Sequence, residues 1–183
     1  MRARLRRDTR VPAGTMLFRG IPVAVAIERS PTRKGPSRVS FTGDQLVVSQ
    51  GQVVTTPAAR TLERWLRRQA REDVVRTIAH YAERIDVAHG RVYIMDQRTK
   101  WGNCSALGNL SFNWRIVMAP EGVLHYVVAH EVLHLAVPDH SQRFWLTLQS
   151  LYPESDRARQ WLAANADHLR VDLAAVISAK RDG

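Results

Sequence analysis

The residues with the clearest chemistry form the short segment His130-Glu131-Val132-Leu133-His134. In a helix, His130 and His134 lie one turn apart and project from the same face, so both imidazoles can reach one small cation. Glu131 then lies about 100° around the helix axis from His130. Its carboxylate is beside the cation without binding it, which suits a base that takes a proton from water activated by the cation. The spacing predicts a metal centre that activates water.

A third ligand separates this prediction from the alternative, a core helix with two hydrogen-bonded histidines. Catalytic zinc sites use three protein ligands and leave one position open. His140 is the leading candidate, because Pro138 ends the helix and a short connection can fold back over it. The interval from His134 to His140 equals that in H-E-x-x-H-x-x-G-x-x-H proteases, although Val137 stands where that motif has glycine. Glu154 is the rival and would give a His₂Glu site.

The segment before the motif supplies three weaker candidates for substrate binding, Trp101, Asn113 and Arg115. Arg115 could stabilise a developing oxyanion or a phosphate. Its alternating position in a strand is equally consistent with a surface salt bridge, and Trp101 and Asn113 are better explained as residues that build the hairpin. Cys104 would be a nucleophile only with a base adjacent to it, and its position in a strand near Trp101 favours a small core residue.

The elements that must position these groups follow from periodicity and from turn residues. Residues 91–96 and 110–118 alternate as strands do, and a glycine-containing turn lies between them. They predict a β-hairpin or meander that packs against long helices. Pro120 opens the helix that carries the motif, Glu121 favours its first turn, and Pro138 stops it.

Three further helices are predicted. The first runs from residue 57 to about residue 85, with Thr56 as its N-cap and Pro57 at its first position. One of its faces carries a basic stripe, which is a second candidate surface for phosphate contact: Arg60, Arg64, Arg67, Arg68 and Arg71. The others are expected over residues 141–153, with Trp145 facing inward, and over residues 156–179.

The charge of the chain divides it unevenly. The net charge is +10, and residues 1–40 hold ten arginines and lysines against two acidic residues. We expect a flexible basic arm over residues 1–14, a small antiparallel β subdomain over residues 15–55, and the main domain over residues 56–183. The asymmetry indicates either an anionic partner, such as a nucleotide or nucleic acid, or a basic solvated tail.

Composition bounds the class of protein. The chain has 183 residues, 45% of them hydrophobic, which suffices for one proper core. No apolar run approaches the roughly eighteen residues of a membrane span, so no membrane is expected among its partners. Cys104 is the single cysteine and fits a reducing, cytoplasmic location.

Several stretches resemble the YgjP-like metallopeptidase-domain family, which is related to SprT-like zinc proteases. These are residues 98–114 (RTKWGNCSALGNLSFNW), residues 115–120, the H-E-x-x-H helix and residues 139–145 (DHSQRFW). The resemblance is strong from about residue 60 to 150 and looser before it. It implies a zincin-type α+β fold, with long helices packed on a small antiparallel sheet after a small N-terminal β unit.

The resemblance also implies site residues. His130, His134 and His140 would be the zinc ligands, and Glu131 the general base. Members have asparagine where this chain has Asp139, whose carboxylate could orient an imidazole.

These observations predict a zinc-dependent hydrolase, most simply a metallopeptidase acting on peptides or proteins. A nucleotide pyrophosphohydrolase is the first alternative, because that activity has been attributed to some members of the family and because the chain is basic. A nucleic-acid-binding module with a structural zinc is the second. The sequence leaves the substrate and the oligomeric state open.

Overall fold

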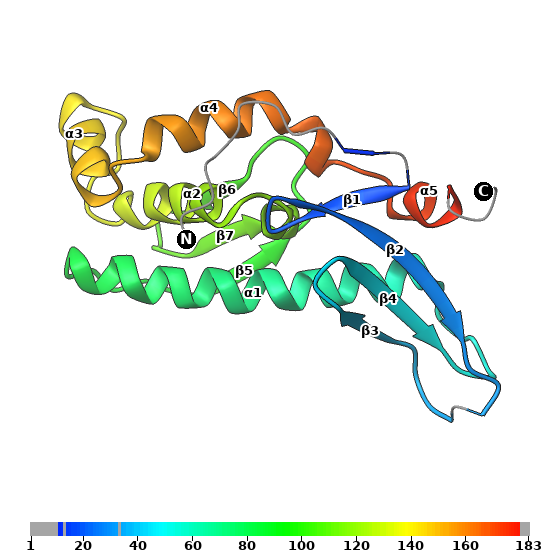
Figure 1. Cartoon of the computed structure of the whole chain (residues 1–183). Helices are drawn as coiled ribbons and strands as arrows, with labels where there is room; N and C mark the ends of the chain where they lie inside the picture. Colours follow the sequence, from blue (N-terminus) through cyan, green and yellow to red (C-terminus); the bar gives the residue numbers. More distant parts are fainter. Residues whose placement is uncertain (1–10, 13, 33, 180–183) are drawn as a thin grey trace.

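One long helix, α1 (Ala58–Arg84), runs along one side of the molecule, and two sheets and helix α2 (Glu121–Leu133) lie against it (Figure 1). The computed structural model describes residues 11, 12, 14–32 and 34–179. The predicted basic arm lies outside the described residues, apart from residues 11, 12 and 14. The described chain is a mixed α+β structure, as predicted.

Helix α1 forms because its apolar residues recur at the helical period. A continuous row of them is fully or almost fully buried: Leu62, Leu66, Ala70, Val74 and Ile78. The predicted cap at Thr56 is wrong, since Pro57 occupies the N-cap position and no side chain caps the helix. Proline is tolerated there because the first helical N–H groups have no partner within the helix.

The N-terminal strands form one four-stranded sheet in the order β1-β2-β4-β3. Its strands are β1 (Thr15–Phe18), β2 (Ile21–Arg29), β3 (Arg38–Phe41) and β4 (Gln45–Gln50). The expectation of a purely antiparallel unit is wrong, because β2 and β4 pair in parallel. β3 intervenes in the chain and pairs with the far side of β4, which leaves the near side of β4 to β2. The division into separate domains stays a prediction.

The second sheet is also mixed, in the order β5-β7-β6. Its strands are β5 (Val92–Met95), β6 (Gly102–Cys104) and β7 (Leu110–Asn113). The hairpin is made by β6 and β7, and β5 joins β7 in parallel, so the predicted antiparallel sheet is wrong. The strand predicted to reach residue 118 ends at Asn113, whose side chain accepts a hydrogen bond from the Arg115 amide and starts a 3₁₀ turn, η1 (Trp114–Met118).

A close contact joins the four-stranded sheet to η1 and to the start of α2. The backbone N–H groups of Arg19 and Gly20 donate to the carbonyls of Val117 and Met118 at 3.0 and 2.9 Å. Gly20 has a φ of +78°, and a Cβ added to it would lie 2.6 Å from Cγ of Pro120, at the start of α2. Only glycine fits both demands. The turn between β1 and β2 is therefore seated on the helix that carries the motif.

The C-terminal part departs from the predicted single helix. It contains α4 (Ser155–Asn165), a 3₁₀ turn η2 (Asp167–Leu169) and α5 (Leu173–Ser178), after α3 (Gln142–Leu151). The predicted helix ends at Asn165, and a new one starts at Asp172, whose side chain caps α5 by accepting from the Ala174 amide at 2.9 Å. Aspartate often starts a helix in this way, because its carboxylate accepts a hydrogen bond from a backbone amide near by.

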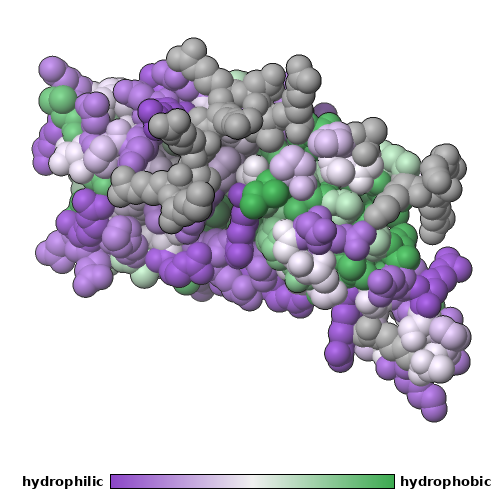
Figure 2. Space-filling view, viewed as in Figure 1, coloured by the Kyte–Doolittle hydropathy of each residue, from purple (hydrophilic) through white to green (hydrophobic). Residues whose placement is uncertain are grey.

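The buried apolar side chains of both sheets and all five helices form one connected core. Figure 2 shows apolar side chains at the surface over the four-stranded sheet and α5, whereas hydrophilic ones prevail over the rest of this face. Within the described ranges, no helix has the length and apolar character that crossing a membrane requires.

Candidate metal centre

Three histidine side chains converge at the end of α2. His130 lies in the last turn of α2, His134 is its C-cap residue, and His140 lies in the connection to α3. Their Nε2 atoms form a triangle with sides of 3.2 Å (His130 to His134), 3.1 Å (His134 to His140) and 3.0 Å (His130 to His140). Three ring nitrogens thus point at one position.

The chain reaches this geometry by ending α2 early. The helix ends at Leu133, not at Pro138 as predicted, and the amides of residues 135–137 close turns onto the carbonyls of Val132 and Leu133. Pro138 follows these turns, and the chain then returns with His140 towards α2. The glycine of the long protease motif is not needed for this return, because Val137 stays in a turn and keeps its side chain buried.

The orientation of His134 is fixed by the same turn. Its Nδ1 lies 3.1 Å from the carbonyl oxygen of Val137. A carbonyl only accepts, so Nδ1 carries the proton and donates, and Nε2 is left with a free lone pair. This is the arrangement that metal-binding histidines commonly show.

Two aromatic residues of α3 support the histidines. Phe144 is buried and stacks on His134, with ring centroids 4.6 Å apart, and Trp145 stacks on His140 at 5.5 Å. Trp145 was predicted to face inward, but 40% of it is exposed. Its ring stacks on His140 instead of entering the core. Both aromatic residues lie in the run of residues 139–145, but spacing alone did not predict their contacts with the histidines.

Burial favours the neutral imidazoles of His130 and His134. Burial, together with a smaller effect of the nearby His134 and His140, lowers the pKa of His130 to about 4. Burial also lowers the pKa of His134, against the hydrogen bond to Val137. Neutral imidazoles are what a cation requires, because a protonated Nε2 has no lone pair to give.

A divalent ion fits the triangle. With metal–nitrogen bonds of about 2.0–2.1 Å in a tetrahedral arrangement, neighbouring ligand nitrogens lie about 3.3 Å apart. The observed 3.0–3.2 Å is close to that value. Nδ1 of His130 is buried without a hydrogen-bond partner among the described residues, so this imidazole is held by packing rather than by a second hydrogen bond.

Glu131 lies on the next position of α2 and faces strand β6. Only 8% of it is exposed, and a Cβ added to Gly102 would lie 2.5 Å from its Cγ. Burial raises the pKa of Glu131 to about 7, while a hydrogen bond from the Cys104 amide and the charge of Lys100 act in the opposite direction. The absence of a side chain at Gly102 is what admits this carboxylate between helix and strand.

The histidines and Glu131 open into one cavity of about 620 Å³. Strand β6 and the turn after it form its opposite wall, and Lys100 supplies a positive charge. Sequence reasoning did not single out Lys100 or Gly102, since their roles depend on the pairing of β6 with β7 and on the approach of α2.

The three weaker candidates are not among the residues that line this cavity. Asn113 is buried and holds the backbone of Gln97 and Arg115. Arg115 forms an ion pair with Asp96 and lies over the ring of Trp114, with its guanidinium carbon 4.4 Å from the ring centroid.

Trp101 contacts the β-structure and the C-terminal part of the chain. Its carbonyl accepts from the Asn113 amide at 2.9 Å, and Arg170 lies over its ring. The contacts of these residues are therefore intramolecular.

Three other expectations concern residues near the centre. Glu154 is not part of the only cluster of potential metal-ligating groups found among the described residues, which consists of the three histidines. Asp139 does not orient an imidazole by a hydrogen bond; its carboxylate accepts from the Ser141 amide at 3.1 Å. Burial raises the pKa of the Cys104 thiol, and the charge of Glu131 adds to this, so the thiol is not activated.

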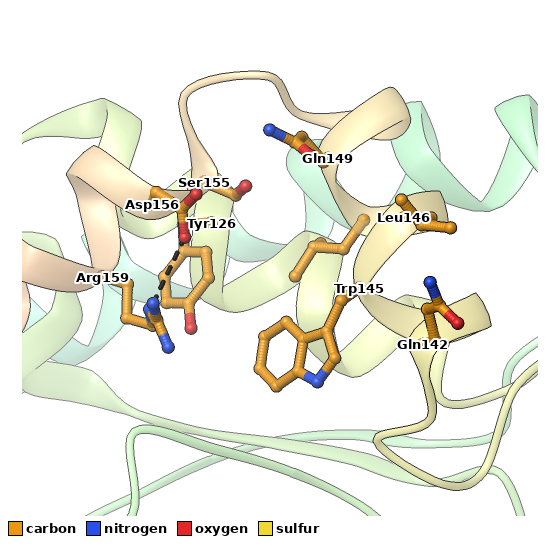
Figure 3. Close-up of a pocket in the computed structure, with 9 residues that line it drawn as sticks. Tyr126, Gln142, Trp145, Leu146, Gln149, Ser155, Asp156 and Arg159 are labelled. Atoms are coloured by element: carbon orange, nitrogen blue, oxygen red, sulfur yellow. Dashed lines mark hydrogen bonds and ion pairs between the residues drawn. The ribbon is translucent and has the colours of Figure 1, made fainter.

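A second cavity, of about 510 Å³, lies beside the centre between α3 and α4 (Figure 3). Trp145 and Tyr126 face it, and Asp156 and Arg159 form an ion pair at one end. Tyr126 also approaches His130, with ring centroids 6.0 Å apart.

Three imidazoles around one position, with a buried carboxylate next to them on an α+β scaffold, define a metal-binding centre of the hydrolase type. The comparison with families agrees. The family model described as YgjP-like, metallopeptidase domain, matches residues 2–165. The chain belongs to this family and is a metallohydrolase.

Comparison with solved structures finds the crystal structure of the metallopeptidase zymogen jannalysin of Methanocaldococcus jannaschii. The identity is 18% and the TM-score 0.44, over 52% of this chain and 89% of that chain. No curated protein matches the chain.

Proposed function

We propose that the protein is a zinc-dependent metallopeptidase in which His130, His134 and His140 hold the ion. The observation that carries this proposal is the triangle of Nε2 atoms with sides of 3.0–3.2 Å. The donor set supports zinc, which favours imidazole nitrogen and accepts three protein ligands with one open position. When bound, zinc acidifies a water molecule and polarises the oxygen of the bond to be cleaved.

Glu131 is proposed as the general base. Its carboxylate lies one residue from His130 in α2, faces the cavity shared with the three histidines, and is held by the Cys104 amide. In this position it can take a proton from the attacking water and pass it to the leaving amine. Gly102 leaves the space that the carboxylate occupies.

Strand β6 is proposed to align the substrate. It is an edge strand of its sheet, and its residues line the cavity opposite the histidines. An extended peptide can add to such an edge through backbone hydrogen bonds, which places a peptide carbonyl beside the metal position. We also propose that the fold around the metal position is of the zincin type.

The test compares Glu131→Gln with His134→Ala in the zinc-loaded protein. Glu131→Gln keeps bound zinc and lowers the rate of peptide cleavage by at least about 100-fold, since a general base contributes that much or more. His134→Ala loses both zinc and activity. An unchanged rate in Glu131→Gln would remove the residue from its role.

The substrate class is tested on the same samples. A peptide library and a panel of nucleoside triphosphates are incubated with the wild-type protein and with Glu131→Gln. Cleaved peptides that depend on Glu131 support the peptidase. Release of pyrophosphate or phosphate without peptide cleavage would replace it by a nucleotide pyrophosphohydrolase. Zinc binding without either reaction would favour a structural zinc.

A further inference from the structure

A third cavity lies away from the metal centre, between β3 and the first turns of α1. Its volume is about 520 Å³. We call it the basic groove and define it by the side chains that give it its character: Arg38, Thr56, Thr61, Arg64, Trp65 and Arg68. No acidic residue lines it, and it shares no lining residue with the cavity of the histidines.

The arginines of α1 fall into two groups. Arg60 and Arg67 form ion pairs with Glu63, and Arg71 donates to the carbonyl of Val92 at 3.2 Å. These three arginines are paired with an acidic side chain or with the backbone, so most of the predicted basic stripe has intramolecular partners.

The second group turns into the basic groove. Arg64 and Arg68 are exposed, stand one turn apart on the same face of α1, and meet Arg38 of β3 across the cavity. Within the described part of the chain, none of these three guanidinium groups has an ion pair or hydrogen bond. Like charges at this spacing repel one another, a cost that a bound polyanion removes.

The groove also offers an aromatic surface and a neutral donor. Trp65 is half-buried and packs against Phe18, with ring centroids 5.2 Å apart, which fixes its position at the groove wall. The hydroxyl of Thr56 is of the kind that contacts phosphate oxygens, whereas that of Thr61 already donates to the carbonyl of Pro57 at 3.4 Å. Arginines that follow a phosphate backbone together with an aromatic ring on which a base can stack are the features of single-strand binding sites.

We propose that the basic groove binds the backbone of single-stranded nucleic acid, with Arg38, Arg64 and Arg68 on successive phosphates and Trp65 against a base. The site is independent of the metal centre and does not rest on the proposed peptidase activity. It would place a nucleic acid strand on the same molecule as the hydrolytic centre.

The test measures the binding of a fluorescent 12-nucleotide single strand to the full chain over a series of salt concentrations. Each phosphate contact contributes about 0.7 to the slope of log K against log salt for single strands. Arg64→Ala/Arg68→Ala therefore lowers the slope by about 1.4 and weakens binding about ten-fold near 0.1 M salt. Arg38→Ala, from the opposite wall, lowers the slope by about 0.7.

The matched control is Arg91→Ala/Arg157→Ala, which removes the same charge at exposed positions outside the groove. It leaves the slope within the error of the wild-type value. Equal slopes for all variants, or an equal loss in the control, would overturn the proposal, because binding would then come from elsewhere or from net charge alone. Melting curves confirm that each variant is folded.

Two competitors test the class of ligand. A mononucleotide triphosphate or a duplex of the same length displaces the strand much less well than an unlabelled strand does, because neither offers successive phosphates together with an unpaired base. Equal displacement by the mononucleotide would show a nucleotide pocket, and equal displacement by the duplex would show shape-independent charge binding. Either outcome contradicts the proposal.

Discussion

The metal centre and the basic groove differ in how their charged and polar groups are placed. At the metal centre, three imidazoles come from residues 130–140, and burial keeps His130 and His134 neutral. In the basic groove, the arginines come from β3 and α1, and they are exposed and charged. Desolvated lone pairs suit a small cation, whereas exposed guanidinium groups suit a polyanion.

The two sites therefore tolerate substitutions differently. A buried donor set depends on each member and on the packing that holds it. An exposed charged surface distributes its contribution, so each substitution changes binding by a modest factor. The four predictions below follow from this contrast, in order of decreasing effect.

The largest effect is expected at the third ligand. His140→Ala reduces bound zinc from about one per chain to a small fraction, because two histidines hold the ion far less tightly than three. Activity falls to background. Zinc is measured by atomic absorption after gel filtration. Glu154→Ala is the control and keeps both zinc and activity; loss of zinc in this variant instead would mean that the third ligand was assigned to the wrong residue.

The next prediction concerns the space for Glu131. Gly102→Ala places a Cβ within 2.5 Å of the Glu131 side chain, which must then move. A displacement of about 1 Å can cost on the order of 100-fold in rate, so we expect kcat to fall by about ten- to 100-fold while zinc stays bound.

The control for this variant lies in the same strand. Cys104→Ala keeps the backbone amide that donates to Glu131 and changes only a side chain without a role in the proposed reaction. Its kcat stays within about two-fold of the wild type. A Gly102→Ala enzyme with full activity would show that the position of Glu131 is not limiting.

A third prediction concerns the link between the N-terminal sheet and α2. Gly20→Ala combines a positive φ of +78° with a clash against Pro120. We expect the free energy of unfolding to fall by about 2 kcal/mol, which corresponds to a Tm lower by about 4–8 °C for a chain of this size. Thermal unfolding followed by circular dichroism measures it.

Gly43 is the matched position for this experiment. Its φ is +98°, but nothing lies within 4 Å of an added Cβ. Gly43→Ala therefore reports the backbone strain alone, about 1 kcal/mol. If both variants lose the same stability, the seating of the turn on α2 contributes nothing.

The smallest effect is expected far from both sites. Asp172→Ala removes the N-cap of α5, which packs against α1, and costs about 1 kcal/mol or a Tm lower by about 2–4 °C. Activity and zinc content stay unchanged. Asp167→Ala removes the same charge from an exposed residue that caps no helix. A Tm that falls equally in both variants would attribute the effect to charge rather than to capping.

The residues that converge at the end of α2 could be predicted from the sequence, because helical spacing and one proline place His130, His134 and His140 within reach of one another. Helix α1 could be predicted in the same way, because the helical period of its apolar residues shows which of its faces is buried. The spacing of Glu131 put a carboxylate next to the histidines. These are local features, and local geometry is what a sequence encodes most directly.

The surroundings of these residues depend on long-range packing. The sequence could not show that β5 pairs with β7 in parallel, that β6 lies opposite Glu131, or that Gly102 makes room for it. Strand order depends on competing pairings between segments far apart in the chain.

The partners of the arginines were decided in the same way. Whether a guanidinium on α1 meets Glu63, a carbonyl or the open groove depends on the helix face that β3 and β5 leave free. For this reason the metal centre could be predicted and the basic groove could not, since long-range packing selects the few unpaired charges from a stripe of similar residues.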